Sequence, residues 1–174
     1  VAGTFFQGWV SGPANAAAGP ALGAPPANGM LSEYVVLPEY GVVPIASSLS
    51  FEEAATLPCA GVTAWNALME GTPPVRPGAW VAVLGTGGVS LLALQIAKAA
   101  GARVIATSSS DEKLDRVRAM GADATINYKT TPDVAQAVRE LTGGRGVDVI
   151  IDAVGAATWP INFDAARKGG RIVH

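Results

Sequence analysis

Soft metal ligands are scarce in this chain of 174 residues, which contains one cysteine, Cys59, and one histidine, His174. A single cysteine excludes a disulfide bond within the chain. These two residues cannot by themselves supply the four ligands of a tetrahedral zinc site. We therefore predict no metal site from the residues present.

Long apolar runs are also missing. Gln95 and Lys98 interrupt the longest apolar stretch, so no segment reaches the roughly 18 to 20 residues that cross a bilayer. No basic segment followed by an apolar one opens the chain as a signal peptide would. With 49% apolar residues the chain can bury a sizeable core. We expect a soluble, cytoplasmic protein of one domain, or of one domain and part of another, without a membrane partner.

Basic residues are absent from the first 75 residues, which contain five glutamates. All twelve lysines and arginines lie from Arg76 onward, together with nine acidic residues. The second part of the chain is therefore better suited to binding an anion. Because these cations alternate with acidic residues, we expect no nucleic-acid partner.

The first third of the chain predicts two regions. Residues 1–48 contain six of the twelve prolines and seven glycines, which predicts long loops with short strands at MLSEYVVLP and GVVPI. Residues 49–76 predict a helical connection. Ser50 and Glu53 have the spacing of a capping box, and Pro58 should kink or break the helix.

Residues 77–174 alternate short apolar runs with helical segments, which is typical of βαβ units on a parallel sheet. The predicted strands are WVAVL, RVIAT, ATINY, VDVIIDAV and RIV. Right-handed crossovers give them the order 3-2-1-4-5, a doubly wound Rossmann sheet in which a sixth strand is missing. The clearest helix is predicted to have Thr131 as its cap, Pro132 in its first turn and Gly143 after its end.

A glycine turn joins the first of these strands to a helix. Gly85 permits a tight turn, and Gly87 lacks a β-carbon, so that backbone N–H groups can approach a pyrophosphate. Gly88 begins the helix, while Ser90 replaces the third glycine of the usual fingerprint. A glycine-rich turn without a ligand is the alternative interpretation.

The position that usually binds the adenosine ribose has no acidic residue. About twenty residues after the glycines an NAD-binding fold has Asp or Glu, whereas this chain has Ser108. Ser108, Ser109 and Ser110 can donate hydrogen bonds to a 2′-phosphate, and Lys113 can supply charge, which predicts NADPH. We expect Ser110 to cap the helix at Asp111 in either case. In the alternative interpretation the serines have no role beyond this cap, and Lys113 is a surface lysine.

Several spaced motifs together resemble the medium-chain dehydrogenase/reductase superfamily. They are LSFEEAATLPCAGVTAWNAL, VLGTGGVSLLALQIAKAAGARVIATSSSDEKL, GADATINY and GGRGVDVIIDAVG. The zinc-free, quinone-reductase-like branch and the zinc-type alcohol dehydrogenase-like proteins are the nearest groups. The resemblance implies a fragment, in which residues 1–48 are part of a GroES-like substrate domain and residues 77–174 are a nucleotide-binding domain that is incomplete at its C-terminus. It also implies a homo-oligomer for the full-length protein.

The resemblance further implies a set of cofactor contacts. These are Gly85, Gly87, Gly88 and Val89 for the pyrophosphate, Ser108, Ser109, Lys113 and Tyr128 for the 2′-phosphate, Thr63 for the nicotinamide and Gly155 near its ribose. Cys59 matches the position of one catalytic zinc ligand in zinc-dependent alcohol dehydrogenases. The other ligands would lie upstream of Val1, so we expect Cys59 to be a core cysteine.

The implied activity is that of an NAD(P)-dependent medium-chain oxidoreductase, which transfers a hydride from NADPH to a small-molecule quinone, enone or carbonyl. No catalytic acid or base can be assigned. A zinc-dependent alcohol dehydrogenase and a non-catalytic nucleotide-binding fragment are the alternatives. A methyltransferase would require an acid at the end of the second strand, where Ser108 lies.

Overall fold

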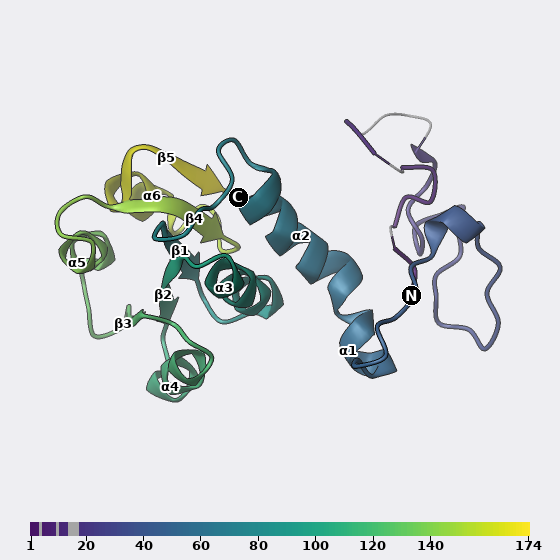
Figure 1. Ribbon diagram of the computed structural model, residues 1–174, viewed down its shortest axis with the longest axis horizontal. Helices are drawn as coiled ribbons and strands as arrows, with labels where there is room; N and C mark the ends of the chain where they lie inside the picture. Colours follow the sequence, from purple (N-terminus) through teal and green to yellow (C-terminus); the bar gives the residue numbers. More distant parts are fainter. Residues whose placement is uncertain (4, 10, 14–17) are drawn as a thin grey trace. The chain divides into compact units, whose positions relative to one another are not determined.

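The computed structural model describes residues 1–3, 5–9, 11–13 and 18–174 (Figure 1). The chain divides into two compact units, Val1–Cys59 and Ala60–His174. The boundary falls inside the region that the sequence predicts as a helical connection.

The described part of the first unit is mostly loop. A short 3-10 helix, η2 (Glu39–Gly41), and two isolated antiparallel bridges, Ala2 with Val42 and Phe6 with Ala21, are its regular features before residue 50.

The two strands predicted in this unit are not formed. Residues 30–38 lack strand pairing, and GVVPI is paired only at Val42. Leu31, Tyr34 and Val36 are at least 90% exposed. Strand propensity reports how well side chains fit a half-buried sheet surface, and no such surface accompanies this segment among the described residues.

Residues 51–70 are helical, as predicted. The segment contains α1 (Phe51–Ala55), the π-helical η3 (Leu57–Gly61), α2 (Val62–Trp65) and the π-helical η4 (Asn66–Glu70). The capping box is confirmed, because the Ser50 hydroxyl accepts from the Glu53 N–H at 3.1 Å and the Glu53 carboxylate accepts from the Ser50 N–H at 2.9 Å. Pro58 lies in η3, where its missing N–H and its ring disturb the α-helical ladder.

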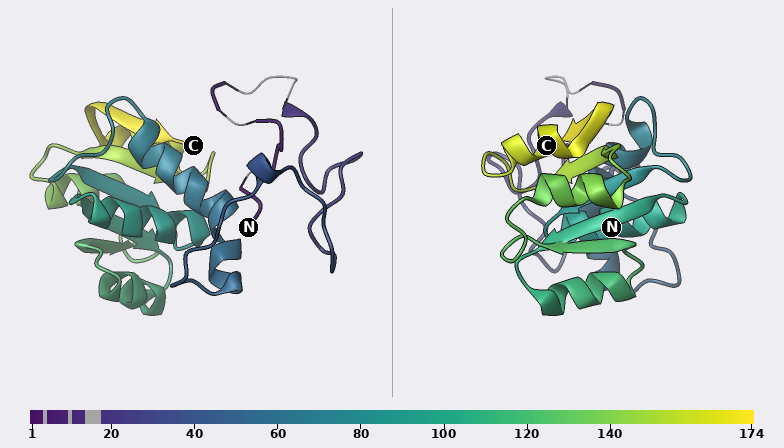
Figure 2. Two further views of the ribbon diagram at one scale, coloured as in Figure 1. Left: turned by 45° about the vertical axis from the view of Figure 1, so that its right-hand side comes forward. Right: turned by 90° about the vertical axis from the view of Figure 1, so that its left-hand side faces the viewer.

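A parallel sheet forms the centre of the second unit (Figure 2). Its strands are β1 (Trp80–Leu84), β2 (Arg103–Ser108), β3 (Ala124–Asn127), β4 (Val147–Asp152) and β5 (Ala166–Val173). Their order, β3-β2-β1-β4-β5, confirms the predicted Rossmann topology.

Successive residues of a strand point to opposite faces of the sheet, and both faces are apolar here. Helices therefore cover both faces. They are α3 (Gly88–Ala99), α4 (Asp111–Ala119), α5 (Val134–Leu141) and α6 (Trp159–Ala165). Val81 and Val83 of β1 pack on the side of η4, α3 and α4, whereas Ala82 and Leu84 pack on the side of α5 and α6.

The N-terminus of α5 corrects one prediction. Asp133 is the cap, since its carboxylate accepts from the Gln136 N–H at 2.8 Å, and Thr131 and Pro132 lie before the helix. Asp133 directly precedes the helix, so its carboxylate can reach the free N–H groups of the first turn. Gly143 follows the helix in the left-handed conformation, with φ of 67°. None of the helices in the described part of the chain combines the length and the apolar character needed to cross a bilayer.

Candidate cofactor site

The predicted cofactor residues of the sheet gather at one edge. Leu84 is paired with Asp152, and Ser108 with Asn127, so strands β1 to β4 end level with one another. The segments that follow these four strands therefore lie side by side at the carboxyl edge, where open parallel sheets bind ligands.

The glycine turn after β1 has an open space in front of it. Gly85 has φ of 84° and donates its N–H to the Thr107 hydroxyl at the end of β2, across 3.1 Å. Gly87 has φ of −81°, which any residue can adopt, and a β-carbon there would meet no atom within 4 Å. Neither the backbone conformation nor protein packing requires glycine at 87, and the absence of a β-carbon leaves room there for a ligand to approach the backbone.

Ser90 explains the departure from a third glycine. Its side chain is buried at 2% exposure, and its hydroxyl donates to the Leu84 carbonyl at 3.1 Å. The serine therefore fits between helix and strand, and its polar atom has a partner there.

The first turn of α3 presents unpaired donors to the same space. The Leu91 N–H is the first of the helix to bond within it, to the Gly87 carbonyl. The N–H groups of Gly88, Val89 and Ser90 therefore have no intrahelical acceptor. Together with the helix dipole they favour an anion, and a nicotinamide dinucleotide's pyrophosphate fits this donor set.

The three serines after β2 have different roles. Ser108 is 4% exposed, and its hydroxyl accepts from the Ser110 N–H at 3.3 Å. Ser110 is the cap of α4 and accepts from the Lys113 N–H at 3.4 Å, as predicted. Ser109 is partly exposed, so its side chain can reach a ligand.

Lys113 and Tyr128 both lie near the end of β2. Lys113 is exposed on the first turn of α4, and the Tyr128 ring is half exposed. The Tyr128 N–H donates to the Ser108 carbonyl at 3.1 Å. The backbones of Ser108 and Tyr128, both predicted contacts of the 2′-phosphate, therefore lie side by side. The side chain of Asp111 also lies here, accepting from the Asn127 amide at 2.7 Å. The sequence did not place this acid beside the predicted contacts, because only the fold brings it to the end of β3.

The two predicted nicotinamide contacts lie on separate segments. Thr63 is exposed on α2. In the preceding turn, the Ala60 β-carbon is 3.7 Å from the position that a β-carbon on Gly88 would take, so this helical segment contacts the glycine turn. Gly155 is buried after β4 with φ of 96°, and the His174 ring lies 3.2 Å from where its β-carbon would be.

Asp152 organises the loop that contains Gly155. Its carboxylate accepts from the N–H groups of Val154 at 2.8 Å and Gly155 at 3.0 Å, from the Thr158 hydroxyl at 2.7 Å and from the Asn162 amide. Burial raises the pKa of Asp152, but these hydrogen bonds outweigh it and hold the pKa below its ordinary value. Asp152 is therefore a fully partnered anion that shapes the loop, a role its position at the strand end did not predict.

The described residues do not form a zinc site. No group of three or more His, Cys, Asp or Glu side chains among them could hold a metal ion. Cys59 is exposed, so the prediction of a core cysteine is wrong. The physical reason is that Cys59 belongs to η3, a turn that contains no buried residue.

The sequence also matches a known protein family. The profile of the zinc-binding dehydrogenases matches residues 88–174. The chain belongs to this family, within the medium-chain dehydrogenase/reductase superfamily of oxidoreductases. A zinc-type alcohol dehydrogenase-like protein of Schizosaccharomyces pombe is 47% identical over 170 residues, which are 97% of this chain and 49% of that protein.

Solved structures share the fold. A Sinorhizobium meliloti protein assigned to the alcohol dehydrogenases is 50% identical with a TM-score of 0.88, over 97% of this chain and 50% of that chain. An NAD-dependent alcohol dehydrogenase is 48% identical with a TM-score of 0.79, over 84% and 42%. A Pseudomonas syringae quinone oxidoreductase is 39% identical with a TM-score of 0.67, over 79% and 45%. The chain thus spans about half the length of these relatives. The relatives named as dehydrogenases support a nicotinamide cofactor.

Proposed function

We propose that this chain binds NADPH along the carboxyl edge of its sheet and belongs to an oxidoreductase that reduces a quinone, enone or carbonyl. The observation that carries this proposal is the open space before Gly87, bordered by the free N–H groups of α3. When bound, the nicotinamide would supply the hydride. The names of the relatives, alcohol dehydrogenase and quinone oxidoreductase, support this reaction class.

We assign each part of the site a role in holding the cofactor. Gly85, Gly87, Gly88 and Val89 bind the pyrophosphate, Ser108, Ser109, Lys113 and Tyr128 bind the adenosine 2′-phosphate, and Thr63 and Gly155 border the nicotinamide and its ribose. In the proposed domain organisation residues 1–48 contribute to a GroES-like substrate domain, residues 49–76 connect it, and residues 77–174 bind the nucleotide. We expect the full-length protein to be a homo-oligomer.

The preference for NADPH depends on charge at the end of β2. Ser108 removes the carboxylate that would repel a 2′-phosphate, and Lys113 is an exposed cation on the adjoining helix turn. Asp111 opposes the preference, because its carboxylate lies at the same edge. Its bond to the Asn127 amide directs one carboxylate oxygen toward β3, so we place the phosphate on the side of Lys113 and Ser109.

Calorimetric titration of NADPH and NADH tests the preference. A charge-assisted hydrogen bond is worth roughly 1.5 to 3 kcal/mol, so Lys113→Ala should weaken NADPH binding by about ten- to a hundredfold at low salt. NADH binding should change little. Lys129→Ala removes the same charge from an exposed neighbouring position and should leave both affinities unchanged. Equal losses for both cofactors in Lys113→Ala would contradict the NADPH assignment.

Ser108→Asp provides the opposite change. Aspartate at 108 can still accept from the Ser110 N–H, while its charge would repel a 2′-phosphate and its oxygens could bind a free ribose hydroxyl. The preference should invert toward NADH. An unchanged preference would show that the end of β2 does not contact the adenosine ribose.

Turnover is tested by following nicotinamide absorbance while a quinone, an enone or an aldehyde is added to the protein and NADPH. Consumption of NADPH that depends on the acceptor supports the reaction class. Tight cofactor binding with no consumption by any acceptor class, both in this chain and in a version extended to both natural ends, would favour a nucleotide-binding role instead.

A further inference from the structure

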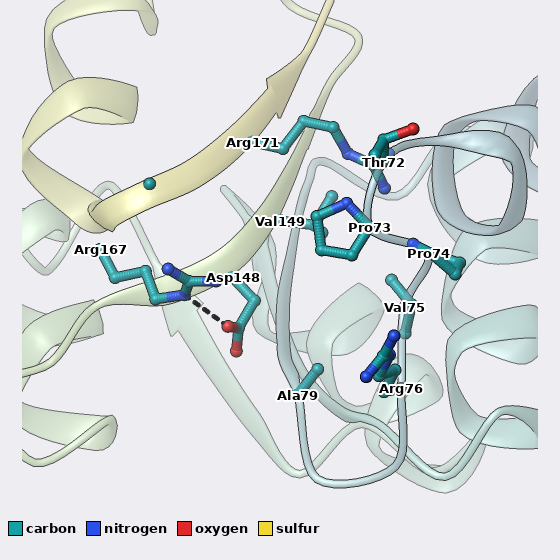
Figure 3. Close-up of a pocket in the computed structure, with 11 residues that line it drawn as sticks. Thr72, Pro73, Pro74, Val75, Arg76, Ala79, Asp148, Val149, Arg167 and Arg171 are labelled. Carbon is teal, nitrogen blue, oxygen red and sulfur yellow. Dashed lines mark hydrogen bonds and ion pairs between the residues drawn. The ribbon is translucent and has the colours of Figure 1, made fainter.

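A second cationic site lies at the amino edge of the sheet, where β1 and β4 begin (Figure 3). It is a cavity of about 250 Å³, bordered by the loop 72–79, the start of β4 and the middle of β5. Three arginines are among the residues that line it, Arg76, Arg167 and Arg171, together with one acidic residue, Asp148.

The carboxylate of Asp148 is already saturated. It accepts from Arg145 at 2.9 and 2.6 Å, from Arg167 Nε at 2.6 Å and from the Trp80 N–H at 2.9 Å. Burial alone would raise the pKa of Asp148, but these partners lower it from 3.8 to about 2, so the group is ionised at neutral pH. Arg145 and Arg167 share this single negative charge. Asp148 therefore does not balance the positive charges of Arg76 and Arg171.

Arg171 is a fixed cation without an acidic partner. Its Nη2 donates to the Ala67 carbonyl at 2.7 Å, near the start of η4. A β-carbon on Gly71 would lie 0.8 Å from Arg171 Nη1, so the absence of a side chain at 71 makes room for the guanidinium. No ion pair among the described residues includes Arg171, and burial lowers its pKa. The charge is thus held in place, partly desolvated and uncompensated.

Arg76 adds a third positive charge from the loop 72–79, which borders the cavity. It is exposed, and no ion pair in the described ranges includes it. Figure 3 shows Arg167 directed toward Asp148 while Arg171 extends toward the loop at Thr72. Like charges gathered around one cavity repel unless an anion lies between them.

The register of β5 is irregular between its two arginines. Val147 is paired with Ala166 and Val149 with Arg171, so two residue steps of β4 face five steps of β5. In a regular strand Arg167 and Arg171 would be separated by about 13 Å, at about 3.3 Å for each residue. The extra residues form a bulge, a feature that natural sheets often use to redirect side chains toward a site.

We propose that this cavity binds a compact oxyanion, either free phosphate or the phosphate group of a small ligand, between Arg76, Arg167 and Arg171. The planar fork of arginine matches the oxygens of phosphate. The site is distinct from the proposed cofactor edge, because Asp148 and Asp152 are four residues apart in β4, about 13 Å along the strand.

Isothermal titration of cofactor-free protein with inorganic phosphate tests the proposal, with sodium chloride of equal ionic strength as the blank. The wild-type chain should bind phosphate, and at least one site should depend on Arg76. Arg76→Gln removes a side chain with no ion-pair partner, so the fold should be retained, and it should weaken phosphate binding at least about tenfold. Asp148→Asn removes the competing negative charge and should tighten phosphate binding.

Two control variants separate this site from other sources of binding. Arg116→Gln removes one positive charge from an exposed pair on α4 and should leave phosphate affinity unchanged. Lys113→Ala reports on phosphate bound at the proposed cofactor edge, so the binding that depends on Arg76 should persist in it. Loss of phosphate binding in Lys113→Ala with retention in Arg76→Gln would place the anion at the cofactor edge and overturn the proposal. Absence of binding by the wild-type chain would overturn it as well.

A titration with glycerol phosphate distinguishes the two sources of the anion. Tighter binding of the ester than of inorganic phosphate, lost in Arg76→Gln, supports a phosphorylated small ligand. Binding of inorganic phosphate that equals or exceeds that of the ester supports free phosphate.

Discussion

The Ser90 hydroxyl donates a hydrogen bond to the Leu84 carbonyl, and so joins the first turn of α3 to the last residue of β1. The donor is buried at 2% exposure. Ser90→Ala removes the donor without adding volume, so we expect a loss of about 1 kcal/mol in the free energy of unfolding. Denaturant titration of the variant measures it. Stability equal to wild type would mean that packing alone decides the residue at 90.

Gly85 and Gly87 should respond differently to alanine. Gly87→Ala adds a β-carbon in open space at an ordinary φ, so stability should be preserved, while cofactor binding should weaken at least tenfold if the pyrophosphate approaches there. Gly85→Ala forces alanine to φ of 84° and should lower stability by about 1 kcal/mol or more. Thermal unfolding and cofactor titration of both variants provide the measurement. Undiminished binding in Gly87→Ala would remove the main support for the cofactor site.

Local patterns in the sequence predicted the features that local physics determines. The alternation of strands and helices predicted the sheet order, and the spacings at Ser50 and Ser110 predicted the two caps. At α5 the sequence predicted Thr131 as the cap, whereas the Asp133 carboxylate accepts the capping hydrogen bond from the Gln136 N–H.

Contacts between distant residues were not predictable in the same way. Asp111 meets Asn127 sixteen residues later, and Arg171 meets Ala67 more than one hundred residues earlier. The first pair depends on the register of β3 beside β2, and the second on the place of β5 in the sheet. No short motif encodes either. The exposure of Cys59 likewise follows from the turn that contains it rather than from its residue type.

Metal content can be tested directly on this chain. The family is named for zinc binding, but the described residues contain no cluster of metal ligands. We expect elemental analysis of the purified chain to find much less than one zinc per molecule. Cys59→Ala should leave cofactor affinity within a few-fold of wild type. One zinc per chain, lost on this substitution, would instead support the zinc-dependent branch and place Cys59 among its ligands.

Asp148 should make stability depend on acid pH. Its pKa of about 2 in the folded chain is below the ordinary 3.8, so its partners stabilise the folded state above pH 4, and this contribution is lost as the pH falls from about 4 through 2. The shift corresponds to roughly 2 kcal/mol. Because the carboxylate side chain is only 14% exposed, solvent screens it little.

The comparison of wild type with Asp148→Asn isolates this contribution from the other carboxylates. At pH 7 the variant should be less stable by roughly 2 kcal/mol, and the difference should shrink toward zero near pH 2, where Asp148 itself takes up a proton. Asp115→Asn is the matched control, since Asp115 pairs with Arg118 on the exposed face of α4 and should contribute at most about 1 kcal/mol. Denaturant titrations at pH 7, 4 and 2.5 measure the differences. A gap between wild type and Asp148→Asn that stays constant over this range would show that Asp148 acts through neutral hydrogen bonds rather than through its charge.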